Sequence, residues 1–282
     1  MSQTLEGKQL ITESPQPARH GWPTWGSLPI APRRAAILLV LIGAWQFGVM
    51  FSHVNPLLVS SPVDVGKAII SGLADGRLVD STWTTLKILL TAMTIGIFVA
   101  AVLTTFATWT KFGEDVLVLF TSMLNPLPSI AILPLAILWF GLNTTALVVV
   151  IANAVIWPIA INVSMGFRTV NPTFLAVGRN IGLSGWKLVR NVLMPAALPH
   201  TISGLKTGWA FGWRTIIAAE LVFGVAGGKG GLGFFINDAR YFMRTADIFA
   251  GLVTIAAIGI FLDLLFGLLE RVTVVKWGMK ST

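Results

Sequence analysis

The chain has 282 residues, of which 55% are hydrophobic and only 11% are charged, and its formal net charge is +8. Soluble globular proteins carry about 25% charged residues, so this composition predicts an integral membrane protein. There is no cysteine, which excludes disulfides and thiolate metal sites, and the three histidines are scattered along the chain. The basic residues are not interleaved with aromatic residues in a cluster, so the positive charge does not predict nucleic-acid binding.

The N-terminal segment, residues 1–34, is polar and rich in proline, which predicts a flexible cytoplasmic tail. Arg33 and Arg34 precede an apolar run from Ala35 to Phe51, which we interpret as the first membrane-spanning helix. A signal peptide also combines a basic flank with a short apolar core. However, the lead-in is too long for one, and no small-x-small cleavage site follows closely.

Five further apolar segments predict an all-α integral membrane protein with six spanning helices. These segments cover about residues 83–109, 116–140, 145–165, 201–225 and 247–269. With the N-terminus inside, Lys and Arg are about twice as frequent in the cytoplasmic segments as in the outer segments. We therefore predict a transmembrane domain over residues 35–271, a short tail over residues 272–282, and both termini in the cytoplasm.

The third predicted span contains three prolines, Pro126, Pro128 and Pro134, in the stretch NPLPSIAILPLAILWFG. Each proline removes a backbone donor, and together they kink or break the helix. Within lipid such a break is tolerated only where protein or a water-filled cavity supplies hydrogen-bond partners. We interpret the segment as a broken helix that lines a pathway. A packed kink without substrate contact is the alternative.

Residues 171–199 form a polar, basic segment between the fourth and fifth predicted spans. It is too short to cross a bilayer and contains no acidic residue, but it carries Arg179, Lys187 and Arg190. Its position in the predicted topology is cytoplasmic. A membrane protein that holds such a segment out of the lipid is expected to present it to a partner.

Local signals predict two short helices in this segment. Asn171 is a suitable N-cap and Pro172 fits the first helical position. Gly182 can end the first helix in the left-handed conformation, and Ser184 can begin the second. Basic charge in a cytoplasmic loop is also explained by the positive-inside bias alone, with the apolar face of the loop resting on the membrane.

The fifth predicted span carries a small-residue stripe of Gly204, Gly208 and Gly212, which predicts close approach by another helix. The same span contains Arg214 and Glu220. Charged residues inside a membrane are costly, so they tend to be functional or paired. These two lie six residues apart and do not face each other. Asp263 in the sixth span is the candidate partner of Arg214, and a structural ion pair is the alternative to a role in a pathway.

The glycine-rich stretch from Gly228 to Gly233 fits the G-x-G-x-x-G pattern, but it follows a membrane helix instead of a β-strand. We reject nucleotide binding and interpret the stretch as a tight outer loop that requires positive φ angles. The sequence shows neither a nucleophile–base arrangement nor a metal-binding helix. We therefore expect no enzymatic activity and no cofactor in this chain, so any dependence on ATP must come from a partner.

The basic segment resembles the coupling loop of ABC importer permeases. That pattern is Glu-Ala-Ala, three residues, Gly, nine residues, and Ile-x-Leu-Pro. Here Gly182 takes the glycine position, and the stretch from Val192 to Pro195 is in register with conservative changes. The Glu-Ala-Ala position reads Ala176-Val177-Gly178, so the acidic residue of the pattern is missing.

Other stretches are similar to the nitrate, sulfonate, taurine and bicarbonate branch of these permeases. They are SSPVDV at residues 60–65, NPLPSIAILPLAILWFGLN at 125–143, GWRTIIAAELV at 212–222 and GGLG at 230–233. The resemblance implies a type I importer fold in a bacterial inner membrane. It also implies a homodimer, two cytoplasmic ATPase subunits that carry ATP and Mg²⁺, and a periplasmic binding protein that delivers substrate.

We expect two sets of functional residues. The set expected to couple to the ATPase is Phe174, Ala176, Val177, Gly178, Arg179, Gly182, Trp186 and Pro195. The set expected along the substrate pathway is Pro126, Pro128, Pro134, Arg214 and Glu220. The expected substrate is a small anion or organic solute. A secondary carrier or channel driven by an ion gradient is the alternative, although such carriers often contain internal repeats and none is apparent here.

Overall fold

The computed structural model describes residues 30–52, 55, 57–224 and 230–275. Most of the two predicted tails, residues 1–29 and 276–282, therefore lies outside the described residues. All regular elements in the described part are helices, which confirms the predicted all-α class. The chain divides into two units, residues 1–48 and 49–282. The first unit contains most of helix α1 (Ile30–Phe51), which begins before the predicted start at Ala35.

The second unit contains all the other helices. These are α2 (Pro62–Ala74), α3 (Arg77–Trp109), α4 (Lys111–Leu124), η2 (Ser129–Ile132), α5 (Leu133–Phe140), α6 (Thr144–Arg168), α7 (Pro172–Asn180), α8 (Gly185–Leu188), η3 (Val189–Leu193), α9 (Met194–Ala196), α10 (Leu198–Phe223), α11 (Leu232–Tyr241), α12 (Thr245–Glu270) and η4 (Arg271–Val275).

Four described helices, α1, α3, α6 and α12, are long and apolar enough to cross a membrane, and a bent pair formed by α4 and the η2–α5 segment makes a fifth. Helix α10 has 26 residues but is not among them. It carries Lys206, Arg214 and Glu220. The chain is therefore a multi-pass membrane protein, and the count of six spans stays a prediction.

The third predicted span is a broken helix. Helix α4 and the η2–α5 segment are bent by 90° at the break. Pro126 and Pro128 lie in the break itself, whereas Pro134 lies in the first turn of α5. The first turn of a helix tolerates proline because its backbone N–H groups have no partner within the helix. The predicted break is confirmed, and its cause is the loss of backbone donors at the two prolines between the helices.

Helix α6 packs between α3 and α10 and forms the centre of the second unit. The glycine stripe of α10 lies against α6, and Gly212 also meets α3. A Cβ atom would lie 2.9 Å from the Asn162 Cβ at Gly204 and 2.9 Å from the Ile159 Cγ1 at Gly208. At Gly212 a Cβ would lie 2.9 Å from the Leu89 Cδ1 of α3. The predicted close helix approach is confirmed.

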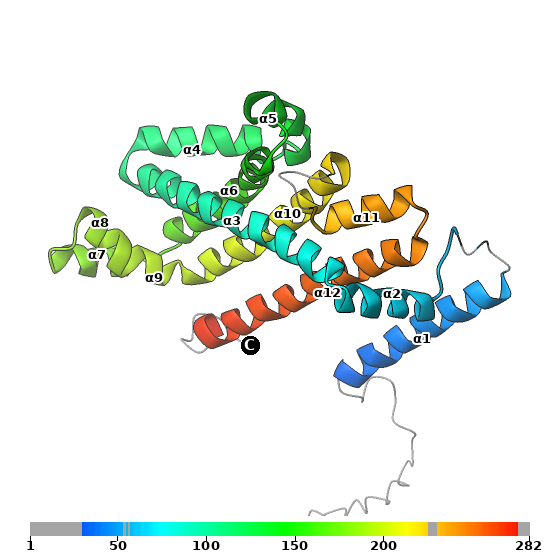
Figure 1. Cartoon of the computed structure of the whole chain (residues 1–282). Coiled ribbons are helices and arrows are strands. Elements are labelled where there is room, and N and C mark those ends of the chain that lie inside the picture. Colours follow the sequence, from blue (N-terminus) through cyan, green and yellow to red (C-terminus); the bar gives the residue numbers. More distant parts are fainter. Residues whose placement is uncertain (1–29, 53–54, 56, 225–229, 276–282) are drawn as a thin grey trace, which may run out of the picture. The chain divides into compact units, whose positions relative to one another are not determined.

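Two short helices, α2 and α11, lie between predicted spans. Helix α2 has a recognisable start signal, because the Ser61 Oγ accepts a hydrogen bond from the Asp64 N–H at 3.2 Å and Pro62 opens the helix. Figure 1 shows α7, α8 and α9 together at one end of the helical bundle, whereas α2 and α11 lie toward the other end. The fold thus separates the basic segment from the glycine-rich stretch.

The close contact between α6 and α10 predicts that Gly204→Ala lowers stability. The added methyl group meets the Asn162 Cβ at 2.9 Å and the Ile159 backbone at 3.4 Å. Overpacking of this kind costs about 1–3 kcal/mol. Thermal unfolding of the purified protein in detergent measures the effect. Gly66→Ala is the matched control, because nothing lies within 4 Å of a Cβ at that helical glycine. Equal melting temperatures for the two variants would contradict the prediction.

Candidate functional site

Residues 171–199, called the coupling segment below, have the local structure that their sequence predicts. The Asn171 Oδ1 accepts a hydrogen bond from the Thr173 N–H at 2.9 Å and caps α7, with Pro172 in the first turn. Gly182 has φ +82°, so α7 ends in the left-handed conformation that glycine favours. Ser184 precedes α8 as its N-cap, without a side-chain hydrogen bond to the helix. The cap at the start of α7 and the left-handed glycine after its end therefore define the course of the backbone in this part of the segment.

The coupling segment has a small apolar core of its own. Val170, Val189 and Leu193 are buried together in this core. Gly178 is also buried, and a Cβ there would lie 2.9 Å from the Leu188 Cδ1 and 3.0 Å from the Val192 Cγ2. Gly178 thus lets α7 lie directly against the α8–η3 segment. The segment is packed internally and joins α6 on one side and α10 on the other.

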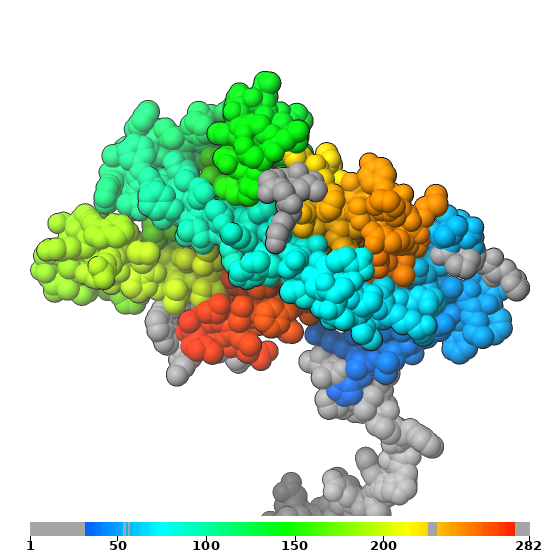
Figure 2. Space-filling view, in the orientation of Figure 1, coloured from blue at the N-terminus to red at the C-terminus, as the bar shows by residue number. Residues whose placement is uncertain are grey.

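The outer face of the coupling segment is apolar and basic. The exposed fractions are 58% for Phe174, 53% for Val177, 70% for Ile181 and 53% for Trp186. The remaining predicted coupling residues with exposed side chains are Ala176, Arg179 and Pro195. Figure 2 shows the segment in yellow-green at the edge of the unit. Exposed aromatic side chains beside arginine are typical of the residues that dominate binding energy at protein interfaces.

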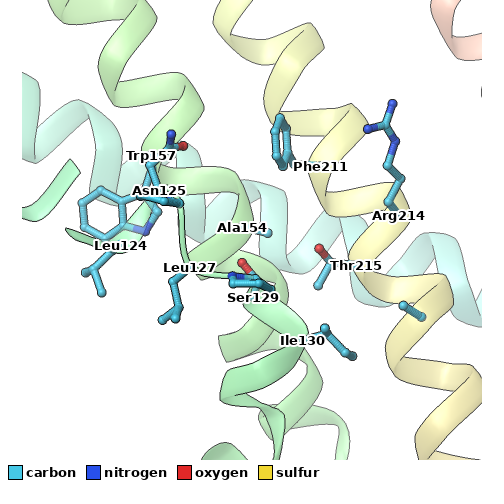
Figure 3. A pocket seen from close by; sticks show the side chains of 13 residues that line it. Leu124, Asn125, Leu127, Ser129, Ile130, Ala154, Trp157, Phe211, Arg214 and Thr215 are labelled. Carbon is cyan, nitrogen blue, oxygen red and sulfur yellow. The ribbon is translucent and has the colours of Figure 1, made fainter. Parts of the chain in front are cut away.

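A cavity of about 300 Å³ lies at the break between α4 and α5. The break contributes the run of residues from Leu124 to Ile130, including Pro126 and Pro128, while Pro134 does not line the cavity. In Figure 3, Phe211 and Thr215 of α10 lie across from Ser129. The cavity therefore combines the broken helix with one face of α10, and it brings Arg214 together with two of the three predicted prolines.

Hydrogen bonds from α6 hold the break in place. The Asn153 Nδ2 donates to the Ser129 Oγ at 3.3 Å, and the Trp157 Nε1 donates to the Asn153 Oδ1 at 3.0 Å. Both bonds join side chains, and they tie Ser129 at the start of η2 to α6. Helix α6 thus supports the irregular backbone that forms one wall of the cavity.

Arg214 lines this cavity, and its side chain is exposed on the protomer. Figure 3 shows the guanidinium extending along α10 toward the level of Phe211. Within the described residues Arg214 has no ion-pair partner. The predicted partner, Asp263, instead forms an ion pair with Lys206, with 2.6 Å between the Lys206 Nζ and the Asp263 Oδ1. Among the described residues, the charge of Arg214 is therefore unpaired.

Glu220 has a different environment and does not line the cavity. Its side chain is 1% exposed, and the Thr85 hydroxyl donates to the carboxylate, with 2.9 Å to each oxygen. The Gly233 N–H donates to the Glu220 Oε2 at 2.9 Å, and the Leu232 N–H donates to the Thr85 Oγ1 at 2.8 Å. A carboxylate at a helix N-terminus is favourable. Glu220 therefore joins α10, α3 and the start of α11.

The expectation of positive φ angles in the glycine-rich stretch is wrong where the structure describes it. Gly231 has φ −87°, Gly233 lies within α11, and neither is among the residues with positive φ. The glycines are required for space. A Cβ at Gly231 would overlap the Glu220 carboxylate, and one at Gly233 would lie 2.6 Å from the Glu220 Cβ. Gly228 and Lys229 lie outside the described residues.

The structure thus defines a class of protein: a helical membrane subunit with a cavity at a broken helix and an exposed, internally packed segment at one end. The chain matches the family described as binding-protein-dependent transport system inner membrane component over residues 92–274. It belongs to this family. It is the permease subunit of an ABC importer, and it is a transport protein, not an enzyme, because ATP hydrolysis in such importers is carried out by a separate subunit.

Individual relatives agree with this assignment. The chain is 32% identical to the riboflavin transport system permease protein RibX of Chloroflexus aurantiacus over 277 residues, which covers 98% of this chain and 99% of that protein. It is 29% identical to the putative aliphatic sulfonates transport permease protein SsuC of Bacillus subtilis over 273 residues, covering 95% and 92%. The resemblance to the sulfonate branch of these permeases is confirmed.

A solved structure shows the same fold. An amino acid ABC transporter with histidines is matched with a TM-score of 0.56 and 20% identity, covering 72% of this chain and 96% of that chain. Within the described part of our chain, no group of three or more His, Cys, Asp or Glu residues is arranged to hold a metal ion.

The buried position of Glu220 predicts that Glu220→Ala destabilises the protein. The substitution leaves the Thr85 hydroxyl and the Gly233 N–H without their acceptor, and each buried group left unpaired costs about 1–3 kcal/mol. Denaturant unfolding in detergent measures the loss. Glu114→Ala is the control, because Glu114 forms an exposed ion pair with Arg168 and such pairs contribute about 0–1 kcal/mol. Similar losses for both variants would rule out the structural role of Glu220.

Proposed function

We propose that two copies of this chain form the translocation pathway of an ATP-driven importer for a small anion or organic solute. Two cytoplasmic ATPase subunits, which carry ATP and Mg²⁺, bind the coupling segments. A periplasmic binding protein delivers the substrate to the outer side. In this arrangement the protein lies in a bacterial inner membrane with both termini in the cytoplasm, as the distribution of Lys and Arg favours.

Arg214 is the observation that carries this proposal. It lies in the middle of α10, exposed on the protomer, beside a cavity of about 300 Å³. A guanidinium that faces lipid in the middle of a spanning helix is costly in free energy. We therefore expect the surface around Arg214 to face a second copy or water. This expectation supports a pathway between two protomers.

The lining of the cavity favours an organic anion as substrate. The guanidinium supplies positive charge without a carboxylate partner among the described residues, and Asn125 and Ser129 add polar groups. Leu127 and Phe211 supply an apolar wall. A sulfonate or carboxylate with a short carbon chain matches both parts. The relatives are named for aliphatic sulfonates and for riboflavin, so relationship alone leaves the substrate open.

The coupling segment supports a mechanical link to the ATPase. It is internally packed, and it is joined to α6 and α10 at its two ends. At this junction a Cβ at Gly166 would lie 2.8 Å from the His200 Cβ, so the ends of α6 and α10 are in close contact. A movement of the ATPase is thereby passed to both helices as a rigid-body shift.

The exposed aromatic residues of the coupling segment predict the effect of Phe174→Ala combined with Trp186→Ala. Loss of both anchors weakens binding of the ATPase by about tenfold or more, because buried aromatic residues dominate interface energies. Co-purification and a titration of the two subunits in detergent measure the affinity. Trp139→Ala on α5 is the control, since Trp139 is 64% exposed but lies away from the segment in the chain. Unchanged affinity in the double variant would argue against ATPase binding at this face.

The unpaired charge of Arg214 predicts that Arg214→Gln lowers transport about tenfold or more while the complex still assembles. The loss arises because an anion in the cavity loses its only described cation among the lining residues. Uptake of labelled ethanesulfonate into proteoliposomes with the ATPase and binding protein gives the rate, and size-exclusion chromatography gives the assembly. Loss of assembly with loss of transport would instead assign Arg214 to a structural role.

A further inference from the structure

Lys206 and Asp263 form an ion pair outside the cavity at the break. Lys206 lies in α10 and Asp263 in α12, and 2.6 Å separates the Lys206 Nζ from the Asp263 Oδ1. The two side chains are 44% and 65% exposed. With Arg214, they line a second cavity of about 170 Å³ between α10 and α12. Two cations and one carboxylate therefore share one cavity.

Helix packing does not account for this pair. A charged side chain that faces lipid is costly, and α12 is apolar enough to cross the membrane. Exposed ion pairs contribute only about 0–1 kcal/mol, so this pair adds little to the joining of the two helices. Since both side chains are largely exposed on the protomer, the α10–α12 face is suited to contact with water or with a second copy.

Lys206 lies on the side of Arg214 that leads along α10 to the coupling segment. Lys206 lies eight residues before Arg214, which is about 12 Å along a helix that rises 1.5 Å per residue. The N-terminal end of α10 leads to the coupling segment. Arg214 lines both cavities, so it is their common member. The guanidinium extends toward the level of Phe211, which is the direction of Lys206 along the chain (Figure 3).

Trp209 supplies a second observation in the same cavity. It lies between Lys206 and Arg214 on α10 and stacks with Trp213, with ring centroids 6.2 Å apart. Its indole Nε1 is buried and has no hydrogen-bond partner in the described part of the chain. Buried donors without an acceptor are rare. This donor belongs to a residue that lines the same cavity as two cations, so an anion in the cavity has a third polar group within its lining.

We propose that Lys206 and Asp263 form a second binding site for the transported anion, between Arg214 and the cytoplasm. This inference rests on the proposed function. The ligand is a small sulfonate or carboxylate. When no anion is present, the Asp263 carboxylate pairs with the Lys206 ammonium group. The transported anion displaces this carboxylate from Lys206. Because the anion competes with a carboxylate of the protein, binding stays weak enough for release, as conduction through successive sites requires.

The double variant Lys206→Met, Asp263→Leu tests the site without leaving an unpaired charge. Its expected uptake of labelled ethanesulfonate into proteoliposomes is at least tenfold slower than that of the wild type. ATPase binding and the melting temperature stay unchanged, because the helices still pack. Lys206→Arg retains transport, since the cation is kept. In Asp263→Asn both kcat and KM fall, because the anion leaves Lys206 more slowly.

The control is Arg168→Met, Glu114→Leu, which removes another exposed ion pair with the same 2.6 Å separation. It transports at the wild-type rate. Normal transport by Lys206→Met, Asp263→Leu would overturn the second site and leave a structural pair. If Arg214→Gln transports normally while the double variant fails, the proposed role of Arg214 falls and the site at Lys206 stands. A wild type that transports no organic anion rejects both proposals.

Discussion

The close contact between α6 and α10 is the constraint on which the rest of the structure depends. It exists because Gly204 and Gly208 remove the side chains that would hold the helices apart. The same two helices carry the coupling segment at one end and the cavity residues along their length. A shift of α10 against α6 therefore moves Arg214 relative to the broken helix that α6 supports, and it changes the junction with the coupling segment.

Two of the three charged residues of helix α10, Glu220 and Arg214, lie in opposite environments. Glu220 is buried, and the Thr85 hydroxyl and the Gly233 N–H satisfy its carboxylate, so it holds three helices in one arrangement. Arg214 is exposed, and its charge has no ion-pair partner in the part of the chain that the structure describes. The two roles are complementary. In the proposed pathway, the rigid C-terminal end of α10 gives Arg214 a fixed position from which to bind the solute.

Apart from the close helix approach at the glycine stripe of α10, the details predicted correctly from the sequence are local ones. The cap at Asn171, the left-handed Gly182 and the break at Pro126 and Pro128 depend on a few neighbouring residues. The partners of Glu220 depend on the tertiary fold, because Thr85 lies 135 residues away in the chain. The positive φ angles expected in the glycine-rich stretch are wrong for the same reason. Its described glycines make room for a carboxylate from another helix. The ion pair of Asp263 likewise reflects helix packing, which periodicity does not specify.

The first and third positions of the coupling motif lie in different environments in this structure. Gly178, at the third position of that motif, is buried against Leu188 and Val192, so it is required by packing within this chain. Ala176, at the first position, is exposed, so a change there alters only what a partner meets. The segment keeps its shape without the acidic residue. Under the proposed function it therefore offers an ATPase an apolar and basic face, to which acidic side chains on the partner are the complement.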